Sequence, residues 1–395
     1  MNTPAFHARP RFPRGFRCAS TRCGIKARGR DLSLFVSDEP CTAAAVFTRN
    51  RLPGAPILVG RELIKSGVLQ AVVVNSRVAN VGTGEEGISR ARRMGEAAAR
   101  ELGIPAPMVL MSSTGVIGLP LPIEKIEAGL SGLSAELRDD PIVGAEGIMT
   151  TDTHPKAVSL AFPAADGEAT LTAVGKGSGM IAPNMATMLV YLFTDAKLEA
   201  PVLDRSLRAV VERTFNMLSV DGDTSTSDTC VLMANGHAGA ADEDVFQEAL
   251  WHVAVRMTEL LARDGEGANR LFRVTVTGAA DESEARIVAR SLVNSPLMKT
   301  MVNGGDPNVG RILMAVGKCF DCRVESRRLS ARIGDVSVLA EGVLTSFDEQ
   351  IVRGALLDDP ADISVDLGIG DGESRAWGCD LSLGYIQENA AYYST

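Results

Sequence analysis

Residues 175–193 read Gly-Lys-Gly-Ser-Gly-Met-Ile-Ala-Pro-Asn-Met-Ala-Thr-Met-Leu-Val-Tyr-Leu-Phe, and this stretch decides how the centre of the chain folds. Its three glycines lie within five residues and allow the backbone to approach another group closely. The apolar run 188–193 has the length of a buried strand, and residues 171–174 predict a strand before the glycines. We therefore expect a glycine-rich turn that leads into a strand in the core of a sheet.

The segments on either side alternate between strand and helix patterns. Short strand patterns occupy 68–75 and 109–111, and the second runs into the polar turn 112–115. Helix patterns cover 84–102, 123–133, 203–216 and 244–263. After residue 290 short strands dominate, at 322–325, 337–340, 363–367 and 376–381. This change predicts a larger α/β domain over residues 1–285 and a smaller α+β domain over residues 286–395.

Two glycine patterns resemble nucleotide-binding motifs. The lysine among the glycines at 175–179 suggests a phosphate loop, but the spacing G-x-x-x-x-G-K-[ST] is absent there. A G-x-G-x-x-G pattern occurs at 82–87, but its two glutamates would face a pyrophosphate, so a simple helix-starting loop is favoured. Neither pattern predicts a nucleotide site.

The composition is that of an ordinary globular protein, with 395 residues, 45% hydrophobic and 23% charged. A formal net charge of −9 argues against a nucleic-acid partner, and no apolar run approaches the length of a membrane span. The first 30 residues contain eight Lys or Arg and no acidic residue. That pattern fits either a transit peptide or a basic arm on a cytoplasmic protein.

Metal and thiol chemistry is not predicted. Seven cysteines include one isolated C-x-x-C at Cys319 and Cys322, which lacks the further ligands of a zinc site. The four histidines form no H-E-x-x-H or Ser-His-Asp pattern. The acidic run 221–228 lacks the spacing of a calcium loop, and we interpret it as a satisfied polar network near the site.

The bond between Ala186 and Thr187 has a possible chemistry of its own. A small residue is followed by a hydroxyl at the start of a buried strand, which suits attack of the Thr187 hydroxyl on the Ala186 carbonyl. Hydrolysis of the resulting ester would leave Thr187 with a free α-amine of pKa about 8. Such an amine can act as the base for its own hydroxyl and needs no histidine. By itself the local pattern also fits a threonine that simply opens a core strand.

Blocks along nearly the whole chain resemble the ornithine acetyltransferase family of arginine biosynthesis, whose members are self-processing enzymes with an N-terminal Thr nucleophile. The blocks that carry the resemblance, besides 175–190, are Arg14-Gly-Phe, Gly24-Ile-Lys, Phe47-Thr-Arg-Asn, Ala55-Pro-Ile, Thr150-Thr-Asp-Thr-His-Pro-Lys, Ser219-Val-Asp-Gly-Asp-Thr-Ser-Thr-Ser-Asp, Gly265-Glu-Gly-Ala, Gly305-Asp-Pro-Asn and Asn389-Ala-Ala-Tyr-Tyr-Ser. Their number and order make the resemblance specific.

The resemblance implies roles for individual residues. Thr187 is similar to the nucleophile, and Thr114 with Gly115 to the pair that stabilises the oxyanion. Lys176 is similar to a lysine suited to a substrate carboxylate, and Glu266 to an acid suited to an ammonium group. The remaining substrate contacts implied are Thr153, with Thr151 as an alternative, Thr187 itself, Asn389 and Ser394.

The resemblance also implies the fold, activity and assembly. The fold is an α/β layered sandwich with sheets between helices, similar to ornithine acetyltransferases and DmpA, plus the smaller C-terminal domain. The activity is transfer of acetyl from N-acetylornithine to glutamate, ping-pong through acetyl-Thr187. No cofactor or metal is implied, although acetyl-CoA is a possible co-substrate. Fragments 1–186 and 187–395 would stay together as a cytoplasmic heterotetramer, two copies of each, acting on small amino acids.

The sequence departs from the family pattern in one segment and at two further positions. Asn75-Ser-Arg-Val-Ala-Asn-Val-Gly-Thr-Gly stands where NSGNANACTG is usual, Val309 where Trp is common and Asn269 where Thr is common. The departures leave other functions open: an acyltransferase paralogue with other amino-acid substrates, or an N-terminal-nucleophile amidase or aminopeptidase. A non-cleaving scaffold on the same fold is the alternative from another class, and the intact Thr187, Thr114 and Gly115 argue against it.

Overall fold

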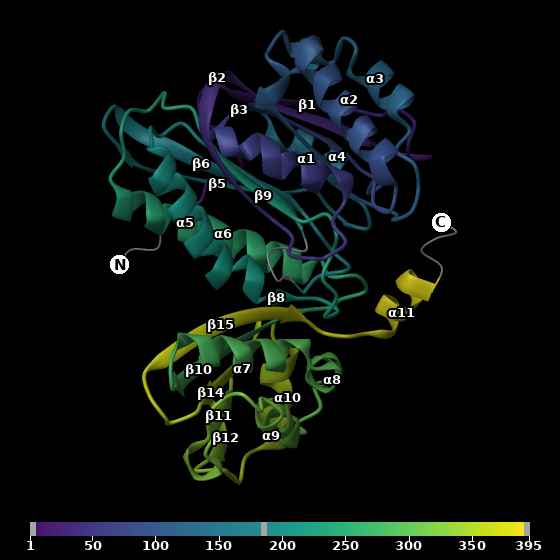
Figure 1. Ribbon diagram of the computed structural model, residues 1–395. Coiled ribbons are helices and arrows are strands. Elements are labelled where there is room, and N and C mark those ends of the chain that lie inside the picture. Colours follow the sequence, from purple (N-terminus) through teal and green to yellow (C-terminus); the bar gives the residue numbers. More distant parts are fainter. Residues whose placement is uncertain (1–4, 183–187, 391–395) are drawn as a thin grey trace. The chain divides into compact units, whose positions relative to one another are not determined.

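The computed structural model describes residues 5–182 and 188–390, and their contacts divide them into two compact units (Figure 1). Unit 1 comprises the described residues of 5–177, 188–212 and 224–257. Unit 2 comprises 178–182, 213–223 and 258–390. The division of the chain into two domains between residues 285 and 286 stays a prediction.

Unit 1 is built on one mixed eight-stranded sheet. The strands run in the order β4-β3-β2-β9-β7-β6-β5, with β1 paired to β2. Two pairs, β3 with β4 and β7 with β9, are parallel and the rest are antiparallel. The strand bounds are β1 Phe16–Thr21, β2 Leu32–Phe47, β3 Val68–Asn75, β4 Val109–Ser113, β5 Lys156–Ala164, β6 Gly167–Lys176, β7 Leu189–Thr194 and β9 Thr229–Ala234.

Both faces of this sheet are covered. Alternate residues of a strand point to opposite faces, and in β3 Val73 packs in one hydrophobic cluster while Val72 packs in another. The first cluster includes Met94 and Ile126, and the second includes Ile148. The helices of unit 1 are α1 Ala55–Leu63, α2 Gly84–Leu102, α3 Ile123–Leu130, α4 Pro141–Ile148, α5 Ala200–Arg213 and α6 Glu243–Arg263, the last two reaching into unit 2.

Unit 2 is built on a second mixed sheet in the order β13-β12-β11-β14-β10-β15-β8. Its strands are β8 Leu218–Ser219, β10 Leu271–Ala279, β11 Ser330–Ile333, β12 Val336–Ala340, β13 Val343–Leu344, β14 Ala361–Asp366 and β15 Gly372–Cys379. Its helices are α7 Glu282–Asn294, α8 Pro296–Gly304, α9 Gly310–Gly317, α10 Glu349–Leu357 and α11 Leu383–Ala390. Two mixed sheets packed with helices confirm the predicted α/β sandwich.

The predicted helices and strands agree with the structure where the local sequence marks the element unambiguously. β3 and α2 have the predicted bounds, because a β-branched run and a helix stopped by Gly103 are unambiguous. The strand predicted at 322–325 is wrong. The backbone N–H of Cys322 closes a turn onto the Cys319 carbonyl, and that of Arg323 donates to the Glu284 carboxylate, so neither is available to a neighbouring strand.

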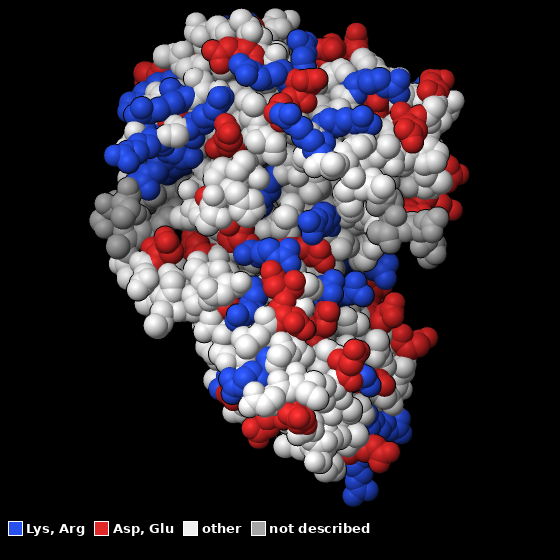
Figure 2. Space-filling view, turned by 180° about the vertical axis from the view of Figure 1, so that it is seen from behind, with Lys and Arg blue, Asp and Glu red and all other residues white. Residues whose placement is uncertain are grey.

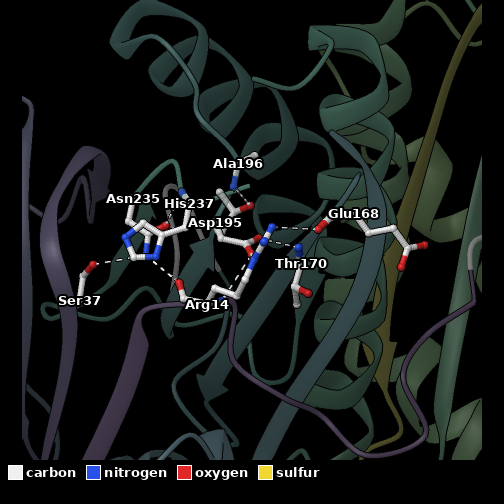
Figure 3. Close-up of polar contacts among 9 residues, drawn as sticks. Arg14, Ser37, Glu168, Thr170, Asp195, Ala196, Asn235 and His237 are labelled. Carbon is white, nitrogen blue, oxygen red and sulfur yellow. Dashed lines mark hydrogen bonds and ion pairs between the residues drawn. The ribbon is translucent and has the colours of Figure 1, made fainter. Parts of the chain in front are cut away.

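A polar cluster fixes the end of β7 (Figure 3). Asp195 directly follows β7 and is 1% exposed; its carboxylate accepts from Arg14 Nε at 2.8 Å and from the Thr170 N–H at 2.7 Å. Asn235, directly after β9, donates to the Arg14 carbonyl at 2.8 Å. The N-terminal segment is thereby attached to the ends of β7 and β9.

The surface carries charges of both signs. Figure 2 shows Lys and Arg beside Asp and Glu over the face seen from behind. Exposed ion pairs of the chain include Arg205–Glu243 and Arg208–Asp204. Exposed pairs of this kind contribute little to stability. Among residues 5–182 and 188–390, no helix is long and apolar enough to cross a membrane.

Candidate active site

Lys176 lies at the end of β6, opposite the first residue of β7 in the sheet register. That first residue, Leu189, is two residues beyond Thr187 in the chain. The Lys176 ammonium donates to the Thr114 hydroxyl at 3.3 Å and to the Thr150 hydroxyl at 3.0 Å, and the residue is 8% exposed. The structure thus brings two predicted site residues, Lys176 and Thr114, into contact.

Thr114 and Gly115 follow the end of β4, which is parallel to β3. The Thr114 N–H donates to the Asn75 carbonyl at 3.1 Å, which continues the β3–β4 pairing. Gly115 has φ +127° and packs so closely on the Arg77 backbone that a Cβ would lie 2.2 Å from the Arg77 carbonyl carbon. Glycine is therefore required there, since any side chain would displace the Arg77 backbone.

The Asp152 carboxylate accepts hydrogen bonds from several groups close to Lys176. Its Oδ1 accepts from Lys156 Nζ at 2.7 Å and from the Gly177 N–H at 2.8 Å, and its Oδ2 accepts from the Thr150 N–H at 2.9 Å. Burial opposes ionisation, but the charges of Lys176 and Lys156 and these hydrogen bonds hold the pKa of Asp152 below its usual range. Asp152 is therefore an ionised carboxylate within the protein.

The threonines of the 150–153 block lie in different surroundings. Thr150 contacts Lys176, whereas Thr153 is exposed and its hydroxyl lies 3.0 Å from His154 Nδ1. The substrate roles predicted for Thr153 and Thr151 stay predictions. Sequence reasoning missed Asp152 and Thr150, although both belong to a quoted block, because spacing along a turn does not show which side chains face the lysine.

Asp228 is a buried carboxyl at the other side of β7. It directly precedes β9, whose Thr229 N–H donates to the Met188 carbonyl at 3.1 Å. Burial raises the pKa of Asp228 well above its usual value, opposed by hydrogen bonds from Ser225, Thr48 and the Met188 backbone. The satisfied network predicted for 221–228 is only partly right, because the described residues offer no hydrogen-bond partner to Asp228 Oδ2 or to the Thr226 and Ser227 hydroxyls.

Asp228→Asn is expected to stabilise the protein at pH 8 and to have a smaller effect at pH 5. The folded-state pKa lies above the unfolded value of about 3.9, so the contribution of the carboxyl to stability is complete below that value and is lost as pH rises through the folded pKa. The amide keeps the size of the protonated acid and does not titrate. We expect Tm to rise by about 2 °C or more at pH 8. An equal shift at both pH values would contradict the buried neutral acid.

Glu266 and Asn389 form a separate pair in unit 2. Glu266 follows α6, is 9% exposed and accepts from Asn389 Nδ2 on α11 at 2.7 Å. Its backbone N–H donates to the Ser178 carbonyl at 2.8 Å, and a Cβ on Gly179 would lie 2.3 Å from its carboxyl carbon. The second half of the glycine-rich stretch is thus packed against the Glu266 carboxylate.

Comparison with known proteins decides the family. The ArgJ family matches residues 17–394. The chain belongs to the ArgJ family. Among its relatives, the arginine biosynthesis bifunctional protein ArgJ of Thermus thermophilus is 46% identical over 384 residues, covering 97% of this chain and 99% of the relative. Glutamate N-acetyltransferase Oat2 of Streptomyces clavuligerus is 43% identical over 390 residues, covering 97% and 98%.

Solved ArgJ-family structures are also similar to this chain. The crystal structure of arginine biosynthesis bifunctional protein argJ from Bacillus halodurans is 40% identical, with a TM-score of 0.49. It covers 52% of this chain and 98% of the solved chain. The family resemblance inferred from the sequence blocks is confirmed by the match over residues 17–394.

Three predicted site residues of this ArgJ-family chain, Ala186, Thr187 and Ser394, lie outside the described residues. Within 5–182 and 188–390, no group of three or more His, Cys, Asp or Glu is placed to hold a metal ion. The predicted site residues described above form two groups. Thr114, Gly115 and Lys176 belong to unit 1, and Glu266 and Asn389 belong to unit 2.

Proposed function

We propose that this ArgJ-family protein is a self-cleaving acetyltransferase of arginine biosynthesis that transfers acetyl from N-acetylornithine to glutamate through Thr187. The observation that carries the proposal is the contact of Lys176 with Thr114, opposite the start of the strand that Thr187 precedes. Relatives that are 42–46% identical over nearly the whole chain and are named as arginine biosynthesis bifunctional proteins support it.

The proposed cleavage breaks one peptide bond with water as co-reactant. The Thr187 hydroxyl attacks the Ala186 carbonyl, and the peptide nitrogen leaves as the Thr187 α-amine, so an ester links the two residues. Water hydrolyses the ester, which leaves a carboxylate on Ala186 and a free hydroxyl on Thr187. The new α-amine then serves as general base for that hydroxyl.

The proposed transfer uses the same hydroxyl twice. Thr187 attacks the acetyl carbonyl of N-acetylornithine, and ornithine leaves with its amine protonated. The glutamate amine then attacks acetyl-Thr187 and releases the hydroxyl. Each tetrahedral oxyanion accepts hydrogen bonds from the Thr114 hydroxyl and the Gly115 N–H; loss of one such donor typically costs about 10²–10³-fold in rate.

The remaining residues are proposed to bind substrate. Lys176 holds a carboxylate, as its ammonium is presented by Thr114 and Thr150 at the end of β6. Glu266 and Asn389 recognise an ammonium group, since the carboxylate already accepts an N–H from Asn389. Thr153 and Ser394 are also proposed to contact the substrate, as the family resemblance implies.

Purified protein incubated with N-acetylornithine and glutamate is expected to form N-acetylglutamate and ornithine in equal amounts. Intact mass should show fragments 1–186 and 187–395, and native mass two copies of each. Formation of acetate without N-acetylglutamate would instead assign a hydrolase, and a single uncut chain would rule out the cleavage. Acetyl-CoA offered in place of N-acetylornithine tests whether a thioester also acylates Thr187.

A further inference from the structure

Arg77 adopts a backbone conformation that arginine rarely takes. Its φ is +84°, in the left-handed region that favours glycine. Asn75 Nδ2 donates to the Val78 carbonyl at 2.9 Å on one side of it, and the Val116 N–H donates to the Arg77 carbonyl at 2.9 Å. The surrounding contacts therefore hold Arg77 in this conformation directly against Gly115, and strained residues of this kind concentrate at functional sites.

The arginine itself is one of the departures from the family pattern, which has glycine at this place in NSGNANACTG. Glycine would adopt φ +84° without strain, so an arginine here has a structural cost. The Arg77 side chain makes no ion pair and no hydrogen bond to any residue of the described chain, and it is only partly exposed. The packing of the fold therefore gives no reason for its charge.

Lys26 supplies a second cation nearby. Its ammonium donates to the Met149 carbonyl at 2.6 Å and to the Arg30 carbonyl at 3.0 Å, which leaves one of its three N–H donors unused. Burial is the main cause that lowers the pKa of Lys26 to about 8; the charges of Asp31 and Asp152 oppose this shift, and those of Lys176 and Arg77 contribute to it. The Met149 carbonyl that Lys26 binds immediately precedes Thr150, whose hydroxyl binds Lys176, so Lys26 lies beside the lysine of the proposed site.

The acidic side chains close to these cations are already engaged. Asp31 accepts from the backbone N–H groups of Cys23, Ile25 and Lys26, at 2.7–2.8 Å. Asp152 is bound to Lys156 and to the Gly177 N–H. Among the described residues, no carboxylate lies within ion-pair distance of Lys26 or Arg77, and the nearby Asp31 and Asp152, which attract Lys26, are held by other donors.

We propose that Arg77 and Lys26 form a carboxylate-binding site that receives the side-chain carboxylate of a dicarboxylic amino-acid acceptor. The inference rests on the proposed function. The planar guanidinium fork matches a carboxylate, which it binds through two parallel hydrogen bonds. Arg77 is therefore a residue that selects glutamate-type acceptors in the second half of the reaction.

Arg77→Gly tests the site, because glycine removes the side chain and suits the backbone at φ +84°. The KM for glutamate is expected to rise about tenfold or more, as for loss of one carboxylate contact worth about 1.4 kcal/mol. The KM for N-acetylornithine should change less than about twofold, and Tm should not fall. Arg77→Lys keeps a cation and should restore part of the affinity. Arg92→Gln, an exposed arginine on α2, is the matched control for loss of one charge.

Acetyl exchange between N-acetylornithine and labelled ornithine separates this inference from the proposed function, since exchange needs no glutamate. If the parent protein catalyses no exchange, the proposed function fails. If exchange continues in Arg77→Gly and the KM for glutamate is unchanged, the carboxylate site is refuted. An equal rise of KM for both substrates would also overturn it, because that result indicates a general disturbance of Gly115.

Discussion

Thr187→Ala is expected to give a single uncut chain without acetyltransferase activity. The variant lacks the hydroxyl that is proposed to attack Ala186 and to carry the acetyl group, so both the proposed cleavage and the proposed transfer would lose their nucleophile. In a serine protease, removal of the nucleophile lowers kcat by about 10⁶-fold, and we expect a loss of at least about 10⁴-fold here. Intact mass and the coupled assay with N-acetylornithine and glutamate measure the two effects on the same sample.

Thr187→Ser is the matched control, because it keeps a hydroxyl at the same position. It should cut, more slowly or to a lower final extent, and retain measurable transfer. Activity at the parent level in an uncut Thr187→Ala chain would exclude Thr187 as the nucleophile. Cutting in that variant would place the reactive bond elsewhere in the glycine-rich stretch.

Asp152→Ala is expected to lower the free energy of unfolding by about 3–5 kcal/mol, the range found when one partner of a buried ion pair is removed. Lys156 is 1% exposed and would remain buried without its carboxylate, and the N–H groups of Gly177 and Thr150 would lose their acceptor. Transfer activity should fall as well, because Lys176 and Thr150 lose the group that organises them. Denaturant unfolding in the uncut Thr187→Ala background measures stability on one covalent chain.

The difference in unfolding free energy between the parent and Asp152→Ala is expected to depend on pH. The pKa of Asp152 is held below its unfolded value, so its stabilising effect is present above about pH 4 and is lost as pH falls through the folded pKa. The gap between parent and Asp152→Ala should therefore be largest near neutral pH and shrink under acid conditions. Asp152→Asn keeps the shape without the charge and should lie between the two. A loss below about 1 kcal/mol at pH 7 would contradict the buried ion pair.

The sequence predicted those parts of the fold whose causes are local. A continuous β-branched run fixed β3, and a helix pattern with a glycine stop fixed α2. The strand predicted at 322–325 failed because its backbone N–H groups are taken by Cys319 and Glu284, which no local pattern reveals. The family blocks predicted Lys176 and Thr114 as site residues, and their contact depends on pairing between segments 62 residues apart.

What the sequence did not predict was the role of charge around these residues. Asp152 was overlooked beside its threonine neighbours, although it holds Lys156 and Gly177. Arg77 was noted only as part of a departure from the family pattern, since its positive φ and its closeness to Gly115 appear only in three dimensions. Burial and backbone strain arise from the whole fold, so a single sequence does not display them.

The strand order of the first sheet bears on whether the chain folds before or after the proposed cleavage. Strands β7 and β9, which follow Thr187, are inserted between β2 on one side and β6 on the other, which precede it. A polypeptide severed before folding would have to thread two strands into a slot within another molecule. The proposed cleavage would therefore have to follow folding of the whole sheet, and its two products would remain held in one sheet; an affinity tag on either fragment is then expected to retrieve both until the sheet is denatured.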